Sequence, residues 1–252
     1  MSELPEPIPA ATLVLMRRLA SGPPELLMME RAGTMAFAAG ALVFPGGRID
    51  PADIAAAAAL APHLEDGAAR IAAIRETIEE TGIAPALTPS PGRAAAAALR
   101  QDLAGGGDFA ALLAGHGFAL DLAALTPFTR WCPAFKHPRR FDTLFYLAEA
   151  PEGDPRAVAD EAEAVRAFWA SAGDVLAELD AGRAHAIFPT RRNLERLARF
   201  GSIEEARADA ARHPVETITP WVEERGGRPW VCIPEGIGYP VTAEPLDSAI
   251  RA

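Results

Sequence analysis

Apolar and acidic positions separate onto opposite sides of residues 68–81, and this separation predicts a helix. Three isoleucines recur at helical spacing and form the apolar stripe: Ile71, Ile74 and Ile78. At about 100° per residue, three glutamates fall within an arc of roughly 100° on the other side: Glu76, Glu79 and Glu80. Gly82 follows and is expected to end the helix as its left-handed C-terminal residue.

The position of these glutamates is unfavourable for a helix without a ligand. Like charges three or four positions apart repel by a few tenths of a kcal/mol per pair. Near the helix C-terminus they also meet the negative end of the helix dipole, at a cost of roughly 0.3–1 kcal/mol each. A bound cation would turn both penalties into attraction, and magnesium prefers such oxygen ligands. The alternative is a solvated acidic face with no ligand.

The remaining hydrophobic pattern predicts a chain in which strands and helices are mixed. Apolar, β-branched and aromatic runs predict strands at 11–20, 25–31, 41–44, 125–133, 141–150 and 163–171, and a C-terminal hairpin within 216–234. Helical patterns cover 55–60, 68–81, 93–104, part of 105–122, 172–182, 189–201 and 203–212. We expect one α/β domain over residues 1–252, with a helical insertion at about 84–123.

Composition narrows the classes of function. Half of the 252 residues are hydrophobic, the net charge is −10 and the pI is near 5.0. This acidity argues against nucleic-acid and anionic-membrane partners, which need a basic surface. Cys132 and Cys232 belong to no C-x-x-C pattern, and the five histidines are scattered, so no zinc framework is expected. No apolar run approaches the roughly 18 residues of a membrane span, and we expect a cytoplasmic enzyme.

Two motifs together resemble the Nudix hydrolase superfamily: "FPGG" at 44–47 and "RETIEETGI" at 75–83. The family pattern is G-x5-E-x7-R-E-U-x-E-E-x-G-U, where U is apolar, and Thr77 departs from it. Gly47 and Arg75 lie 28 positions apart, about twice the spacing in the pattern, so we expect an expanded loop at about 51–66. The early glutamate of the pattern therefore has three open candidates and is assigned to none of them: Asp53, Glu65 and Asp66.

The resemblance implies an α/β/α sandwich with a mixed sheet and a diphosphate hydrolase that uses Mg²⁺ or Mn²⁺. Its implied metal ligands are Glu76, Glu79, Glu80 and the backbone oxygen of Gly46. Arg75 is implied to orient Glu76. Among the carboxylates Asp160, Glu161 and Glu163, we favour Glu163 as a base or additional ligand, with a solvated loop as the alternative.

Residues 27–47 are also similar to the extra motif of coenzyme A diphosphatases. Arg31 fits that motif, whereas Ala36 replaces an arginine. The stretch 126–148 looks like the peroxisomal-type branch and holds a basic cluster: Lys136, His137, Arg139 and Arg140. We expect Arg31, Arg139 and Arg140 to bind substrate, the latter two through the 3′-phosphate or diphosphate; a basic turn without ligand is the alternative.

The expected substrate is a small nucleoside diphosphate-linked molecule, first coenzyme A or acyl-coenzyme A. The expected products are 3′,5′-ADP and (acyl-)4′-phosphopantetheine. An ADP-ribose or nucleotide-sugar diphosphatase is the alternative enzyme, and a non-catalytic nucleotide-sensing module is the alternative of another class. The sequence does not determine the choice between Mg²⁺ and Mn²⁺, the acyl-chain preference or the oligomeric state, for which a homodimer is one option.

Overall fold

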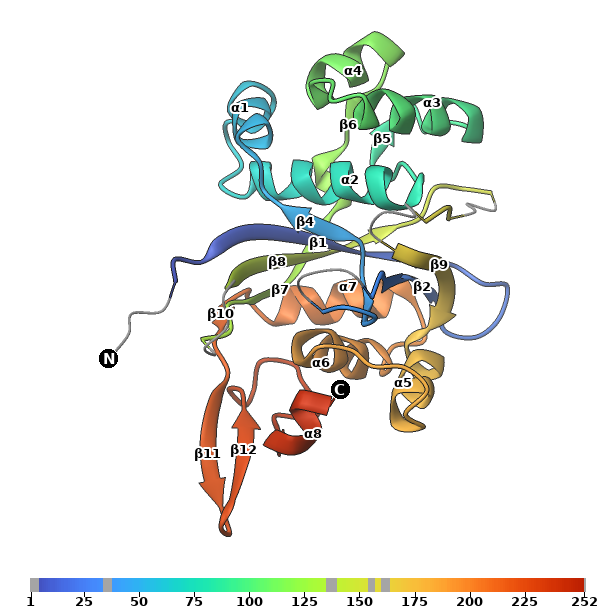
Figure 1. The fold of residues 1–252 in the computed structure, drawn as a ribbon. Helices are drawn as coiled ribbons and strands as arrows, with labels where there is room; N and C mark the ends of the chain where they lie inside the picture. Colours follow the sequence, from blue (N-terminus) through green and yellow to red (C-terminus); the bar gives the residue numbers. More distant parts are fainter. Residues whose placement is uncertain (1–4, 34–37, 135–139, 154–156, 160–163, 252) are drawn as a thin grey trace.

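The computed structural model describes the backbone of the chain except for residues 1–4, 34–37, 135–139, 154–156, 160–163 and 252. Side chains are described for the same residues except 250 and 251. The part of the chain described here folds as a mixed sheet between two layers of helices (Figure 1). This arrangement confirms the α/β/α sandwich expected from the sequence.

Eight of the described strands form the central sheet. Its main path, in spatial order, is β10 (Thr217–Ile218), β7 (Thr126–Trp131), β8 (Phe141–Glu149), β1 (Ile8–Arg17), β2 (Glu25–Arg31) and β3 (Leu42–Val43). Two strands branch from this path: β4 (Gly46–Arg48) pairs with β1, and β9 (Ala164–Ser171) pairs with β2. The β1–β8 and β7–β10 pairs are parallel and the other pairs are antiparallel.

The central strand β1 is apolar on both faces because each face supports a separate core. Leu13 and Leu15 pack into one core, and Val14 and Met16 pack into the other. Successive side chains of a strand point to opposite faces. The continuous apolar run of β1 therefore reflects a strand that is buried on both sides.

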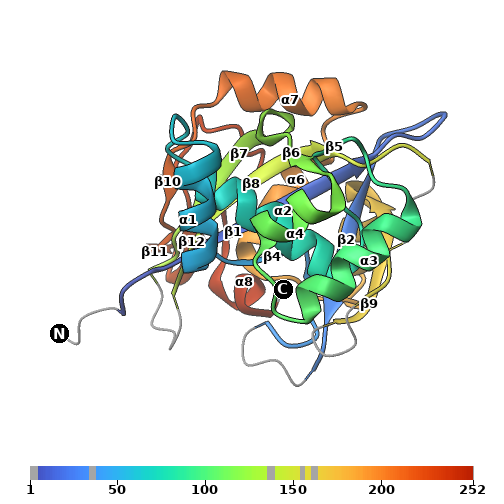
Figure 2. The same ribbon diagram turned by 90° about the horizontal axis from the view of Figure 1, so that it is seen from above.

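One helical layer covers the face on which the acidic helix lies (Figures 1 and 2). Its helices are α1 (Pro51–Leu60), α2 (Gly67–Thr81), α3 (Arg93–Ala104) and α4 (Phe109–His116). The other layer and the C-terminal part contain α5 (Ala172–Asp180), α6 (Phe188–Leu197), α7 (Ile203–Arg212) and α8 (Leu246–Arg251). The short helix η1 (Leu122–Ala124) leads from the first layer into β7.

The expanded segment expected at 51–66 is present, and the helix predicted at 55–60 within it is confirmed and begins earlier. Helix α1 occupies Pro51–Leu60 and begins with a capping box between Asp50 and Asp53. The segment 84–123, which the sequence predicts to be a helical insertion, contains the helices α3 and α4. Its two ends are joined by pairing of β5 (Leu87–Thr88) with β6 (Ala119–Leu120). Both additions lie on the outer side of α2 (Figure 1).

A small antiparallel sheet follows the second helical layer. It consists of β11 (Trp221–Arg225), β12 (Arg228–Cys232) and β13 (Ala243–Pro245). The pair β11–β12 confirms the expected C-terminal hairpin, which projects from the body of the molecule in Figure 1. In the described part of the chain, no helix has the length and hydrophobicity needed to span a membrane.

Candidate active site

Helix α2 buries its isoleucines and places Glu76 and Glu80 against the start of β4. Ile71, Ile74 and Ile78 are fully buried in the core between α2 and the sheet. Gly82 ends the helix with φ of 70°, as expected. The glutamates are not a fully solvated face, because Glu80 is 3% exposed and the side chains of Glu76 and Glu79 are 16% and 35% exposed.

The two glycines of "FPGG" allow β4 to lie against both β1 and α2. A Cβ on Gly46, which has φ of 155°, would lie 2.4 Å from the backbone oxygen of Ala11. A Cβ on Gly47 would lie 2.4–2.5 Å from the carboxylate atoms of Glu76. Any larger residue would therefore displace β4 or push the Glu76 carboxylate away.

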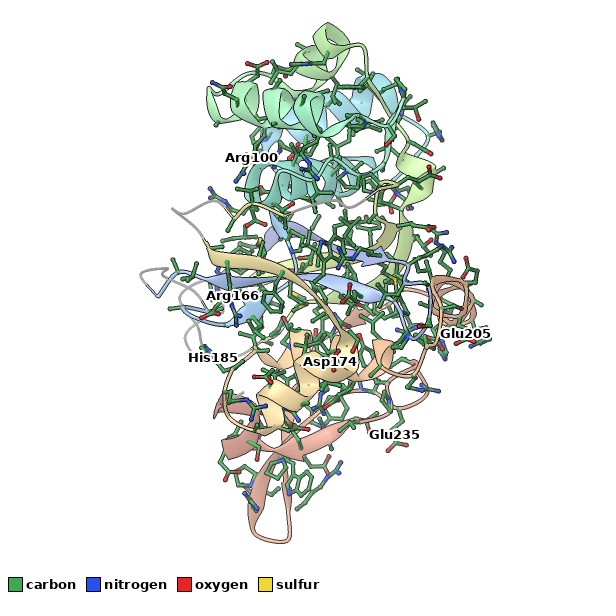
Figure 3. All side chains as sticks on the ribbon, turned by 90° about the vertical axis from the view of Figure 1, so that its right-hand side faces the viewer. Arg100, Arg166, Asp174, His185, Glu205 and Glu235 are labelled. Atoms are coloured by element: carbon green, nitrogen blue, oxygen red, sulfur yellow. The ribbon has the colours of Figure 1, made fainter. Side chains whose placement is uncertain are left out.

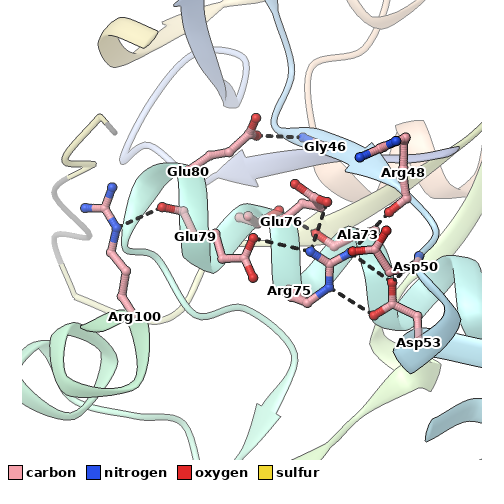
Figure 4. A network of polar contacts seen from close by, with 11 residues as sticks. Gly46, Arg48, Asp50, Asp53, Ala73, Arg75, Glu76, Glu79, Glu80 and Arg100 are labelled. Atoms are coloured by element: carbon pink, nitrogen blue, oxygen red, sulfur yellow. Dashed lines mark hydrogen bonds and ion pairs between the residues drawn. The ribbon is translucent and has the colours of Figure 1, made fainter. Parts of the chain in front are cut away.

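A hydrogen bond joins this turn to the acidic helix. The backbone N–H of Gly46 donates to Oε2 of Glu80 over 2.8 Å (Figure 4). The motif at 44–47 and the motif at 75–83, separated in sequence by α1, thus form one constellation in space.

Arg75 is the centre of the ionic network along α2 (Figure 4). Its guanidinium contacts both carboxylate oxygens of Asp53, with Nε–Oδ1 and Nη2–Oδ2 distances of 3.0 and 2.8 Å. Nη1 donates to Glu76 over 2.9 Å and to Glu79 over 3.3 Å. Nη2 also donates to the backbone oxygen of Arg48. Arg75 therefore holds α1, α2 and β4 together.

The surroundings shift the protonation equilibria of two groups in this network. Burial raises the pKa of Glu79, and the charge of Arg75 only partly offsets that effect. Burial by itself would lower the pKa of Arg75, but the Asp53 hydrogen bonds and the Glu76 charge outweigh it and raise the pKa. Arg75 is thus a permanent cation among carboxylates.

The structure distinguishes the three candidates for the early acidic residue of the Nudix pattern. Asp53 is 1% exposed and pairs with Arg75. Asp66 instead accepts hydrogen bonds from Arg70 and from the hydroxyl of Tyr146, and Glu65 is exposed. Of the three candidates, Asp53 is the one that contacts Arg75, and its assignment to the early acidic position of the pattern stays a prediction. Counting forward from Gly47 leads to Asp53 and counting back from Arg75 leads to Glu65 or Asp66, so the sequence by itself did not choose among them.

The donor set around α2 fits a hard divalent cation in its chemistry. Carboxylates and a backbone carbonyl are the ligands that Mg²⁺ and Mn²⁺ take. In the described residues, however, no three acidic, histidine or cysteine side chains converge into a cation-binding group. Glu76 and Glu79 are directed toward Arg75, and Glu80 is directed toward the N–H of Gly46. The ligand roles of Glu76, Glu79, Glu80 and Gly46 remain predictions.

The predicted substrate-binding residues belong to segments other than α2 or lie outside the described part of the chain. Arg31 ends β2, and its Nε is buried without a hydrogen-bond partner among the described residues. Arg140 immediately precedes β8 and donates to the backbone oxygen of Pro133. Glu163 and Arg139 lie outside the described residues, as do Ala36, Lys136, His137, Asp160 and Glu161. The binding roles of Arg31, Arg139 and Arg140 and the role of Glu163 are therefore still predictions.

Sequence reasoning did not identify one further residue at the end of α2. Nε of Arg100, which belongs to α3, donates to the backbone oxygen of Glu79 over 2.8 Å (Figure 4). Figure 3 shows where Arg100 lies in the helical layer on this side of the sheet. No motif marks Arg100, because its proximity to α2 depends on how the insertion packs.

Comparison with known proteins assigns the family. No family model and no curated protein matches the chain. The crystal structure of a Nudix hydrolase from Alicyclobacillus acidocaldarius is 33% identical, with a TM-score of 0.70 over 81% of this chain and 96% of that chain.

Two other solved structures resemble the chain less closely. The NUDIX domain of Shewanella oneidensis NrtR, solved with ADP ribose, is 15% identical with a TM-score of 0.45, over 77% of this chain and 88% of that chain. A C. elegans Ap4A hydrolase is 18% identical with a TM-score of 0.38, over 69% of this chain and 86% of that chain. With the two motifs joined in space and a relative that is similar over nearly its whole length, this chain belongs to the Nudix hydrolases.

Proposed function

We propose that the protein is a metal-dependent pyrophosphohydrolase that cleaves the diphosphate of a nucleoside diphosphate-linked compound. The observation that supports this proposal most directly is the contact of Gly46 and Gly47, at the start of β4, with α2. There a backbone N–H meets Glu80, and a missing side chain leaves room for Glu76. The contact brings β4 against Glu76 and Glu80, two of the three carboxylates proposed as ligands, and Glu79 lies on the same helix.

In this proposal, Glu76, Glu79, Glu80 and the backbone oxygen of Gly46 hold Mg²⁺ or Mn²⁺. When bound, such an ion neutralises diphosphate charge and lowers the pKa of an attacking water. The carboxylates must rotate from their contacts with Arg75 and Gly46 to share an ion. Arg75 limits the cost of gathering like charges, because its guanidinium already lies among them. Asp53 keeps that guanidinium in place from the buried side.

Coenzyme A or acyl-coenzyme A is the first choice of substrate. The support is the motif at 27–47, which includes Arg31, and the basic residues Arg139 and Arg140 before β8. Hydrolysis would give 3′,5′-ADP and (acyl-)4′-phosphopantetheine. An ADP-ribose or nucleotide-sugar diphosphatase is the second candidate, favoured by Ala36 at a position where the coenzyme A motif has an arginine.

Replacement of Glu80 tests the mechanism. Glu80→Gln keeps the side-chain size and removes the charge, so we expect kcat to fall at least about tenfold, equivalent to roughly 1.4 kcal/mol of barrier. Glu224→Gln on the exposed strand β11 is the matched control and should behave like the unmutated enzyme. A fully active Glu80→Gln enzyme would refute the assigned mechanism.

A panel of substrates with magnesium tests the specificity. Coenzyme A, dephospho-coenzyme A, ADP-ribose, NADH and diadenosine polyphosphates would be compared by kcat/KM. If Arg139 or Arg140 contacts the 3′-phosphate, loss of that group should lower kcat/KM by roughly ten- to a hundredfold. Equal kcat/KM values for coenzyme A and dephospho-coenzyme A would show that the enzyme does not recognise the 3′-phosphate. Faster hydrolysis of ADP-ribose would favour the second candidate.

A further inference from the structure

Most arginines in the described part of the chain are paired with carboxylates, as expected for an acidic protein. Among the described side chains, five arginines form no ion pair with a described Asp or Glu: Arg31, Arg48, Arg100, Arg140 and Arg199. An arginine left without a counter-charge in a chain of net charge −10 is available for an anionic ligand. Arg199 instead donates to the backbone of Gly238 in the opposite layer.

Arg100 differs from the rest of this set because it is anchored at the acidic helix. It lies one position after Leu99, which is fully buried, and on the side of α3 that faces α2. The last carbonyls of a helix lack internal donors. Arg100 supplies one of those donors to Glu79, and the backbone N–H of Val158 supplies another to Thr81.

The anchor uses only one edge of the guanidinium. Nε donates to the Glu79 oxygen, whereas the structure gives Nη1 and Nη2 no hydrogen bond to a described residue. Gly82 lies beside this edge without blocking it, since even a Cβ at that position would be in ordinary van der Waals contact, 3.5 Å from Nη1 of Arg100. Figure 4 shows this guanidinium beside the end of α2 at the level of Glu79. Two parallel donors are thus held in place without an acceptor among the described side chains, which suits bidentate contact with a phosphate.

We propose that Arg100 is a substrate-binding residue that the helical insertion brings to the active site, and that its Nη atoms contact a phosphate group of the nucleotide substrate. This inference rests on the proposed function and adds a specificity-determining contact to it. It also gives the insertion at 84–123 a role, since α3 carries the arginine to the catalytic helix. None of the motif residues predicts this contact.

Steady-state kinetics of Arg100→Met, Arg100→Lys and the unmutated enzyme test the proposal. Because a lost charge-assisted contact weakens binding, we expect Arg100→Met to raise KM about tenfold or more, with kcat within about threefold. Arg100→Lys keeps the charge but loses the planar guanidinium with its two parallel donors, so its KM should be intermediate. Arg183→Met removes the same charge from an exposed pair with Glu178 on the other layer and should leave KM unchanged.

Thermal melts separate substrate contact from a purely structural cap. A lower melting temperature of Arg100→Met with an unchanged KM would show that Arg100 only caps α2, and the proposal would be overturned. A lower kcat with an unchanged KM would also overturn it, because Arg100 would then act through Glu79 and not on the substrate.

Equilibrium binding of ADP with magnesium keeps this test independent of turnover. We expect calorimetry to give a Kd for Arg100→Met about tenfold higher than for the unmutated protein. If the unmutated protein hydrolyses no diphosphate of the panel but Arg100→Met still weakens ADP binding, the proposed function fails and the arginine contact holds. Equal Kd values for the two proteins, or no ADP binding by the unmutated protein, would reject the contact.

Discussion

Asp53 illustrates how one buried carboxylate supports the site through a contact that sequence spacing left open. It is 1% exposed and forms two hydrogen bonds with Arg75, which is itself buried. Removal of one partner from a buried ion pair leaves the other charge uncompensated. The pair therefore determines whether Arg75 stays among the glutamates.

Asp53→Asn should lower the free energy of unfolding by about 3–5 kcal/mol. Urea denaturation of the metal-free protein would measure this change. Asp50→Asn is the matched control, since Asp50 lies at the start of the same helix, its side chain is 53% exposed and its oxygen is 3.9 Å from Arg75. An exposed pair contributes about 0–1 kcal/mol. Equal effects of the two substitutions would contradict the assigned role of Asp53.

Gly47→Ala should reduce activity because the new Cβ would lie 2.4–2.5 Å from the Glu76 carboxylate. We expect kcat/KM to fall at least about tenfold, since a catalytic group displaced by about 1 Å can cost a hundredfold. Gly115→Ala in α4 is the control, because nothing lies within 4 Å of its Cβ position. It should leave kcat/KM unchanged. An active Gly47→Ala enzyme would mean that Glu76 can leave its position without effect.

At the scale of the element, α2 combines a good core face with an unfavourable polar face. Its isoleucines are fully buried, whereas its glutamates repel one another near the negative end of the helix. Arg75, Arg100 and the N–H of Gly46 offset part of that repulsion. A divalent ion would offset more of it.

Thermal melts with millimolar Mg²⁺ or Mn²⁺ should therefore show a higher melting temperature than the metal-free protein. At an ion concentration a hundredfold above Kd, binding stabilises the folded protein by about 2.7 kcal/mol. For a chain of this size, each kcal/mol raises the melting temperature by about 2–4 °C. Glu79→Gln and Glu80→Gln should each show a smaller shift. The absence of a shift with either ion, in the unmutated protein at neutral pH, would count against a metal site on α2.

At the scale of the whole molecule, the sheet depends on helices on both of its faces. The core opposite α2 includes Val14, Met16 and Met28 from the sheet and buried side chains from α5, α6 and α7. Those helices all follow Ser171 in the sequence. The carboxylate site, in contrast, lies entirely on the other face.

A chain of residues 1–171 should retain the motif residues around α2 and lose cooperative folding. The exposed sheet face would give up burial worth roughly 25 cal/mol per Å² of apolar area. We expect no cooperative transition in circular-dichroism melts and strong binding of a hydrophobic dye. A chain of residues 1–245 lacks only residues 246–252, which include α8, and should still melt cooperatively. Cooperative melting of the 1–171 chain at the full-length temperature would show that the second layer is dispensable.

The expectations that the structure confirms are those that depend on local pattern. The period of Ile71, Ile74 and Ile78 predicts α2 because helix geometry repeats along the chain. Apolar runs predict β1, β7 and β8 for the same reason, with ends that differ by a few residues. Within 51–66, the helical pattern at 55–60 predicts part of α1, but the change in motif spacing indicates only that residues have been added and not where the helix begins.

The sequence by itself thus determined the fold class, the family and the residues that crowd the acidic face of α2. Short motifs and the spacing of buried residues depend only on residues close together along the chain. Tertiary structure alone decided that Asp53, and not Asp66 or Glu65, pairs with Arg75, and that Gly47 makes room for Glu76. It also brought Arg100 to the end of α2. These contacts join segments separated by whole helices, and their partners are selected by packing in three dimensions, which sequence spacing does not encode.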